Sequence, residues 1–225
     1  MATVTYINND YETLAEAMQQ LVTMGYFASV EYDGTNSAVV CYDADENAVL
    51  TITKTSASNP TIDLRLDGGT TKSATYANCG APYYTYLCSG GMYIAFNGGN
   101  YGNYAGLFVS KTNNDKVGFM TFMPTGSNVP RYKNVRAWAT DDNSTQMDTT
   151  FECPPPTLRN QTTLLDFPTC NEAGTASFFP DCFFTFTSQF AYTSNSATPP
   201  VNFTQNGKRY LWVGYFAIRD EEETS

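Results

Sequence analysis

The sequence contains no histidine, and this limits which residues could perform chemistry. This absence excludes the Ser-His-Asp and Cys-His nucleophilic mechanisms, and it removes the commonest ligand of transition metals. Carboxylate, lysine and tyrosine chemistry are left. Asp141 and Asp142 could form the acid pair of a glycosidase, which needs two carboxyl groups at a set separation across a sugar. Their neighbours are turn-forming residues, so a solvated loop is favoured, and we predict no catalytic residue and no enzymatic activity.

A metal-binding pattern occurs in part at Asp43-x-Asp45-x-Asn47, which imitates the start of an EF-hand loop. The imitation fails because Ala48 stands where the loop needs glycine and Lys54 where it needs a bidentate glutamate. A hairpin turn explains the three residues better. A phosphate-binding loop is followed by a helix. The glycine-rich segments 90–91 and 98–102 are not followed by a helical pattern. We therefore predict no metal site and no cofactor.

The cysteines show no Cys-x-x-Cys pair, which disfavours a zinc ribbon. There are six of them, Cys41, Cys79, Cys88, Cys153, Cys170 and Cys182. They are too sparse for a disulfide scaffold, and the first residues show neither the basic nor the apolar part of a signal peptide. The sequence therefore predicts free thiols in a chain that is made in a cytoplasm.

A group of tyrosines, mixed with asparagine and glycine, is the best candidate for a binding surface. Its members are Tyr83, Tyr84, Tyr86, Tyr93, Tyr101 and Tyr104. Flat aromatic rings bordered by amides suit sugar rings, and they suit another protein or the inside of this one equally well. Packing in the core or at an interface is the favoured interpretation, and glycan binding is the alternative.

The charge balance limits the partners. The chain has 225 residues, 15% of them charged and 15% aromatic, and a formal net charge of −10. An acidic protein repels nucleic acids and anionic lipids, and no apolar run is long enough to cross a membrane. We expect neither nucleic-acid binding nor membrane insertion. So few charges leave neutral surface that a partner or a second copy of the chain should cover.

The element with the clearest start and stop signals is a helix over residues 11–24. Asn9 followed by Glu12 predicts a capping box, apolar residues then recur at helical spacing, and Gly25 predicts the end. The apolar stripe should lie on a sheet. Short alternating segments then predict a three-stranded β-meander over residues 27–32, 37–42 and 48–53, followed by a one-sided strand over 61–66.

The centre of the chain predicts a β-hairpin with strands over residues 104–111 and 116–123, preceded by a strand over 92–96. Apolar residues occur on both faces of the second strand, so we expect the hairpin to be covered on both sides. A further strand is expected over residues 131–140. The fold class is therefore mainly β (α+β): an antiparallel β-sandwich or meander sheets, with one N-terminal helix packed on a sheet.

The predicted division of the chain is a helix-plus-meander unit over residues 1–72 and a β-rich domain over 73–225, with one continuous domain as the alternative. An extended arm is expected near 141–160, because a run of prolines favours polyproline II and lacks the backbone donors of a sheet. The candidate arm residues for assembly are Pro154, Pro155 and Pro156.

The last predicted hairpin turns at Asn206-Gly207 and continues as one strand over residues 208–219. Its candidate assembly residues are Tyr210, Trp212, Tyr215 and Phe216. The segment 207–220 resembles the C-terminal strands of virion structural proteins from tailed bacteriophages, and the acidic, Asn/Thr/Tyr-rich style of the chain is similar to theirs.

This resemblance implies a structural subunit of the virion, in the tail, the baseplate or a head-associated position, made in the host cytoplasm. The implied partners are further copies of the chain, in a symmetric homo-oligomer, and other virion proteins. The alternative is a carbohydrate- or receptor-binding β module, on a phage particle or elsewhere, with a host surface glycan as its ligand.

Overall fold

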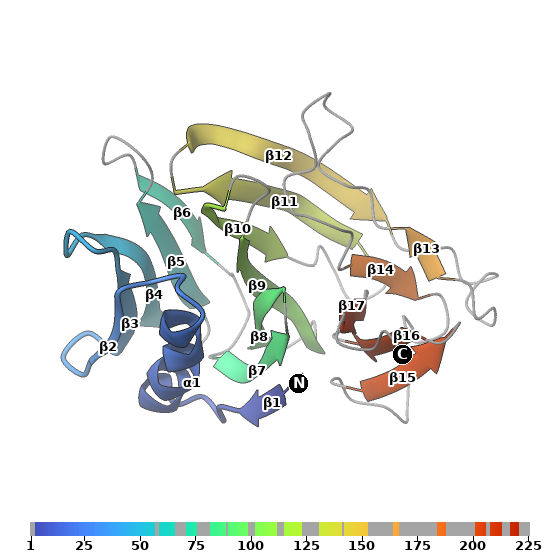
Figure 1. Cartoon of the computed structure of the whole chain (residues 1–225), viewed down its shortest axis with the longest axis horizontal. Helices are drawn as coiled ribbons and strands as arrows, with labels where there is room; N and C mark the ends of the chain where they lie inside the picture. The colour runs from blue at the N-terminus through green and yellow to red at the C-terminus, as the bar shows by residue number, and fades with distance from the viewer. Residues whose placement is uncertain are drawn as a thin grey trace.

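The computed structural model describes residues 3–56, 59–65, 71–75, 82–88, 90–98, 102–111, 115–122, 131–140, 142–152, 164–166, 184–187, 201–205, 208–212 and 217–220. In these ranges the chain forms one helix and three antiparallel sheets (Figure 1). The predicted fold class is confirmed: the protein is mainly β, and its N-terminal helix packs on a sheet.

The helix α1 spans Tyr11–Thr23. Its N-cap is Asp10, whose carboxylate accepts hydrogen bonds from the Glu12 amide at 3.0 Å and the Thr13 hydroxyl at 2.8 Å. The expected cap at Asn9 is wrong because Asn9 has a φ of 69°, whereas a capping residue needs the extended backbone that Asp10 has.

The C-terminus of α1 follows the sequence prediction. Gly25 has a φ of 74°, which costs glycine little. Its amide donates to the Val22 carbonyl, and the Tyr26 amide donates to the Leu21 carbonyl, both at 2.9 Å. These two bonds form a Schellman motif, which ends the helix and directs the chain into the first sheet.

The N-terminal sheet contains the three strands of the predicted meander, the strand predicted over 61–66 and one further strand. Its strands pair in sequence order: β2 (Ser29–Asp33), β3 (Ala38–Tyr42), β4 (Ala48–Ser56), β5 (Asn59–Arg65) and β6 (Thr71–Thr75). The strand β6 lies where the boundary near residue 72 was expected. That boundary stays a prediction.

The largest sheet has seven strands in the order β1-β7-β8-β9-β10-β11-β12. They are β1 (Thr3–Tyr6), β7 (Pro82–Cys88), β8 (Gly91–Gly98), β9 (Gly102–Lys111), β10 (Val117–Phe122), β11 (Arg131–Ala139) and β12 (Asp142–Glu152). The central hairpin is confirmed as β9 and β10, and every residue of β10 is buried, as expected for a strand covered on both sides.

The strand β12 corrects the expectation of an extended arm or connection near residues 141–160, since residues 142–152 pair antiparallel with β11. The register sets Arg131 opposite Glu152 and Arg136 opposite Asp148. The polar sequence of β12 has no apolar alternation that would predict a strand. The proline run 154–156 lies outside the described residues.

The third sheet has the order β13-β14-β17-β16-β15. Its strands are β13 (Leu164–Asp166), β14 (Phe184–Thr187), β15 (Val201–Gln205), β16 (Lys208–Trp212) and β17 (Ala217–Asp220). The hairpin at Asn206-Gly207 is confirmed, because Gln205 pairs with Lys208. The single strand over 208–219 is wrong: β16 and β17 pair with each other, and Trp212 faces Ala217. Gly214, a residue type that favours turns, lies between them in the sequence.

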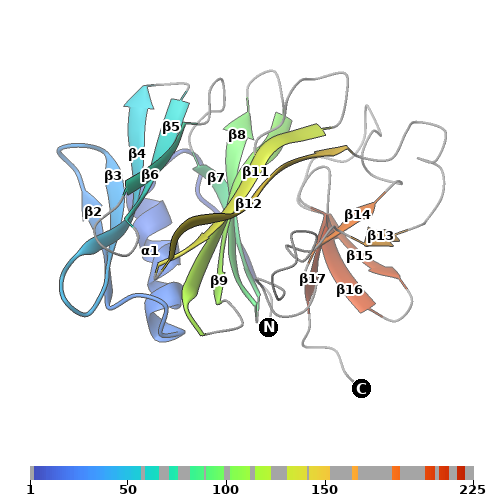
Figure 2. The same cartoon turned by 90° about the horizontal axis from the view of Figure 1, so that it is seen from above.

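The main core lies where α1, the N-terminal sheet and the seven-stranded sheet meet (Figure 2). Leu14, Met18 and Leu21 of α1 are buried there, so the predicted helical stripe packs as expected. The N-terminal sheet contributes Val39 and Leu50 to the same cluster. The helix thus fills the junction between the two sheets.

Candidate functional site

The two faces of the seven-stranded sheet carry different side chains, because neighbouring residues of a strand point to opposite faces. The helix-side face belongs to the main core and includes Met92, Ile94, Phe96, Leu107, Val109 and Phe119. The residues of the opposite face, here called the tyrosine face, are also buried. They are Tyr84, Tyr86, Tyr93, Phe108, Met120 and Phe122.

The tyrosine face leads to the surface through a row of ring contacts. Tyr93 lies 6.3 Å from Phe122 and 6.4 Å from Tyr84, measured between ring centroids. Tyr84 contacts Tyr83 at 5.9 Å and Tyr6 at 6.5 Å, and Tyr6 contacts Tyr83 at 6.1 Å. Tyr84 and Tyr93 are fully buried, Tyr83 is half-buried, and Tyr6 is 53% exposed. The row thus ends in one accessible ring.

The buried tyrosines are poor candidates for acid–base chemistry. Burial raises the pKa of Tyr84 well above its ordinary value, so its phenol stays protonated at neutral pH. The Tyr84 hydroxyl has no hydrogen-bond partner within the described ranges. The Tyr93 ring lies directly over Gly106, where the β-carbon of any other residue would overlap it. This arrangement is one of packing.

The strand β1 is the edge of the seven-stranded sheet, and in the described part of the chain only β7 pairs with it (Figure 1). The Ile7 amide donates to the Tyr83 carbonyl at 2.8 Å. Along an antiparallel edge strand, residues whose N–H and C=O groups point toward the neighbouring strand alternate with residues whose groups point away from the sheet. Thr3 and Thr5 therefore bond to β7, and the N–H and C=O groups of Val4 and Tyr6 point away from the sheet.

This edge lacks the usual protection against pairing with another chain, which is a charged residue or a proline in the strand. The sequence of β1 is Thr-Val-Thr-Tyr. The edges β2, β6, β12 and β13 each contain at least one charged residue, and β15 is the other uncharged edge among the described strands. An open, neutral edge beside the exposed Tyr6 ring is the most distinctive surface feature of the described residues.

The structure brings together only some of the candidate residues. Tyr84 and Tyr86 are buried and Tyr83 is half-buried, which agrees with packing as the favoured interpretation. Tyr101 and the side chain of Tyr104 lie outside the described part.

The assembly candidates are placed less fully. Tyr210 and Trp212 are in β16, and their side chains are not among those described; Tyr215, Phe216 and the three prolines lie outside the described ranges. Sequence reasoning missed Tyr6. Its only local signal is its place in a short Thr-Val-Thr-Tyr strand.

The segment 43–47, which partly matches an EF-hand loop, forms a turn, as predicted. One oxygen of the Asp43 carboxylate accepts hydrogen bonds from the amides of Asp45 at 3.0 Å and Asn47 at 2.8 Å. The bond from the Asn47 amide is the main cause of a lowered pKa of Asp43. Among the described residues no group of three or more acidic or cysteine side chains could hold a metal ion.

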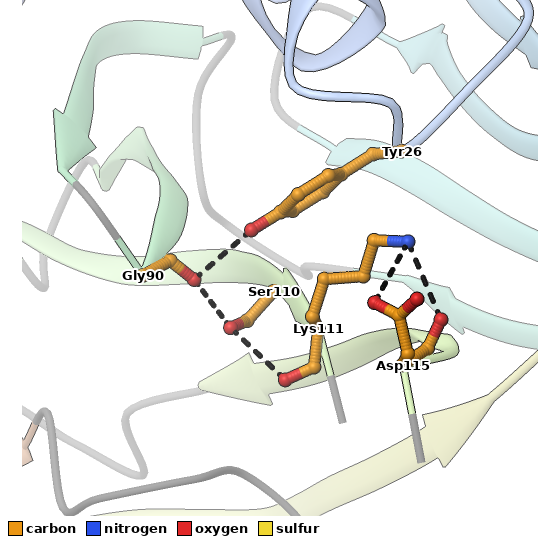
Figure 3. A network of polar contacts seen from close by, with 5 residues as sticks. All are labelled: Tyr26, Gly90, Ser110, Lys111 and Asp115. Atoms are coloured by element: carbon orange, nitrogen blue, oxygen red, sulfur yellow. Dashed lines mark hydrogen bonds and ion pairs between the residues drawn. The ribbon is translucent and has the colours of Figure 1, made fainter. Parts of the chain in front are cut away.

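A polar network joins the segment after α1 to the central hairpin (Figure 3). The Gly90 carbonyl accepts hydrogen bonds from the Ser110 hydroxyl and, at 3.4 Å, from the Tyr26 hydroxyl. The Lys111 ammonium lies 5.4 Å from the centre of the Tyr26 ring and 3.5 Å from the Asp115 carboxylate. Burial raises the pKa of Tyr26 to about 12. Because the phenol stays neutral and the lysine is paired, this network is a structural joint.

No described helix has the length and apolar character that crossing a membrane requires. The comparisons with known proteins give no relative: no protein-family model, no curated protein and no solved structure matches this chain.

Proposed function

We propose that this protein is a structural subunit that works by homo-oligomeric assembly and has no enzymatic activity. The observation that carries the proposal is the open, uncharged edge of β1 beside the exposed ring of Tyr6. A monomer gains nothing from such an edge, since unpaired backbone donors and acceptors invite another strand. An assembling subunit uses it as an interface.

The composition supports the same proposal. Charged residues make up only 15% of the chain, against about a quarter in an average globular domain. Few charges reduce the cost of bringing copies together, because charged groups at an interface must lose water. The setting that we propose is the virion of a tailed bacteriophage, in the tail, the baseplate or a head-associated position, as the resemblance of residues 207–220 implies.

Sedimentation velocity of the purified protein tests the assembly. The wild type should form a discrete oligomer at tens of micromolar, and Tyr6→Lys should weaken it by placing a charge at the edge. Tyr32→Lys is the matched control, because Tyr32 is the other exposed large aromatic among the described side chains and lies in β2. A wild type that stays monomeric, alone and with other particle components, contradicts the proposal.

The virion setting needs its own test. Antibodies against the chain should label purified phage particles at one defined position in electron micrographs. Particles that contain no detectable chain by mass spectrometry would remove the virion from the proposal and leave the assembly.

A second candidate function is glycan or receptor binding, and one observation favours it. Asn8 and Asn9 are exposed and come shortly after Tyr6 in the sequence, separated from it by the buried Ile7, and amide side chains near an accessible ring suit a sugar. On a glycan array this function predicts saturable binding that Tyr6→Ala removes and Tyr32→Ala keeps. Tyr84→Ala is unsuitable as a test because Tyr84 is buried.

A further inference from the structure

We propose that two copies of the chain pair through β1, antiparallel and about a twofold axis, with Thr5 of one copy facing Thr5 of the other. The inference rests on the proposed function, since it names the partner of the β1 edge and the register of the contact. Pairing of this kind joins the two seven-stranded sheets into one continuous sheet.

The register follows from the backbone. Only Val4 and Tyr6 direct their N–H and C=O groups outward, and in an antiparallel pair outward residues must face outward residues. Val4 of each copy therefore faces Tyr6 of the other. Each of these two pairs exchanges two backbone N–H···O=C bonds, so four hydrogen bonds flank Thr5.

The other symmetric registers fit less well. Centring the axis on Tyr6 would place Val4 opposite Asn8, whose φ of 53° ends the extended backbone. Centring it on Val4 would place Tyr6 opposite Ala2, which lies outside the described residues. The Thr5-centred register is the one that keeps both outward residues opposite residues of the strand.

The side chains suit a second copy. Val4 and Tyr6 lie on the tyrosine face, opposite Tyr86 and Tyr84 of β7. Each exposed Tyr6 ring would then cover the Val4 of the other copy, and such aromatic–β-branched pairs stabilise antiparallel strands, as does a Thr–Thr pair at the axis. Two molecules that each carry a net charge of −10 can approach along this strand without placing like charges at facing positions.

The twofold symmetry also explains why an unprotected edge can be tolerated. A twofold contact between the same strand of two copies is closed. Both β1 edges are then paired with each other, so the contact cannot extend into a fibre. The partner that fits this edge best is therefore the same strand of a second copy.

Disulfide trapping tests the register. Thr5→Cys places two thiols at the axis in a non-hydrogen-bonded pair, where the Cα atoms are about 4.5 Å apart and within the range of a disulfide. Thr3→Cys is the matched control on the same face, because its two copies would be four residue steps, roughly 13 Å, apart. We expect mild oxidation to give a reductant-sensitive dimer band for Thr5→Cys, and no more dimer for Thr3→Cys than for the wild type.

A second pair of variants tests the hydrogen bonds. Val4→Pro removes an outward N–H that β7 does not use, a position where edge strands tolerate proline, whereas Val4→Thr keeps it. Val4→Pro should weaken the dimer about tenfold or more, because each dimer loses two hydrogen bonds, and Val4→Thr should stay close to the wild type. If Val4→Pro does not fold, the trapping result alone decides.

The outcomes separate this inference from the proposed function. An oligomeric wild type without Thr5→Cys trapping, or with equal trapping of Thr3→Cys, overturns the β1 pairing and leaves assembly through another surface. A monomeric wild type overturns both.

Discussion

The helix-side face and the tyrosine face of the seven-stranded sheet are both buried, but they are built differently. On the helix-side face, aliphatic chains such as Ile94, Leu107 and Val109 pack with α1. On the tyrosine face, large rings such as Tyr84 and Tyr93 contact one another and lead to the exposed Tyr6. The first face is packed mainly by aliphatic side chains, and the second mainly by aromatic rings, several of which carry phenol groups.

The difference shows what each face contributes. Aliphatic burial is the main source of stability, at about 25 cal/mol for each Å² removed from water. Buried hydroxyls offset part of that gain when they lack partners, and rings as large as Tyr93 need space, which Gly106 provides. Both faces therefore stabilise the fold by burial, and the tyrosine face in addition needs a glycine at position 106 to accommodate its rings.

The largest expected effect concerns the helix side. Leu21 of α1 is fully buried in the main core, so Leu21→Ala should lower the free energy of unfolding by about 2–5 kcal/mol. Gln20→Ala is the matched control because Gln20 is the exposed neighbour. Chemical denaturation measures both, and equal midpoints for the two variants would mean that α1 does not dock through this stripe.

The next effect concerns the tyrosine face. In Gly106→Ala the new methyl group would overlap the Tyr93 ring, and overpacking of this kind costs about 1–3 kcal/mol. If the overlap is the cause, Tyr93→Leu should cost less in the Gly106→Ala background than in the wild type, with a coupling of about 0.5 kcal/mol or more. Strict additivity of the two changes would show that Tyr93 does not limit the space at Gly106.

The sequence predicted the elements whose signals are local. The stripe of α1, the stop at Gly25, the meander and the Asn206-Gly207 hairpin each follow from residues close together in the chain, and the structure has them. The strand β12 was missed because its sequence shows no apolar alternation, and its pairing with β11 is not visible in residue types. Asp10 was missed as the cap because the left-handed backbone of Asn9 is not visible in residue types.

The candidate site was predicted only in part, for the same reason. A cluster of tyrosines is visible in the sequence, but which rings are buried depends on the pairing of β7 with β8 and of β1 with β7. Thr3 pairs with Leu87, far along the chain. The edge position of Tyr6 is therefore a property of the topology, and no short-range pattern could have shown it.

A smaller effect is expected from removing buried hydroxyls. Neither the Tyr84 nor the Tyr11 hydroxyl has a hydrogen-bond partner in the described ranges, so replacing either residue by phenylalanine should change stability at pH 7 by no more than about 1 kcal/mol, in the stabilising direction. Thermal denaturation measures this, and a loss above that size would reveal a hydrogen bond to the hydroxyl.

The same two variants have a signature at alkaline pH. Burial raises the pKa of Tyr11 to about 12, so above the ordinary value of about 10 the unfolded chain loses its proton before the folded one does. The stability contributed by the protonated phenol is therefore complete below pH 10 and is lost as the pH rises through about 12. Tyr11→Phe should flatten the fall in stability over this window, and an unchanged slope would contradict the assigned cause.

The smallest expected effect concerns the thiols, which occur on both sides of the comparison. Cys41 lies in the main core and Cys88 on β7, and both side chains are buried. Burial raises the pKa of Cys41 above its ordinary value, and the Cys88 thiol donates to the Gly91 carbonyl at 3.5 Å. Since alkylating reagents react with exposed thiolates, neither residue should be labelled in the folded protein.

On unfolding without reductant, both thiols should react fully, and reductant should not shift the denaturation midpoint. The other four cysteines, Cys79, Cys153, Cys170 and Cys182, lie outside the described residues and are predicted to behave in the same way. Mass spectrometry of alkylated peptides decides this for each position. A pair that is labelled only after reduction would be a disulfide, and the chain would then gain stability by restriction of its unfolded state. Its presence would also contradict a protein made and kept in a reducing compartment.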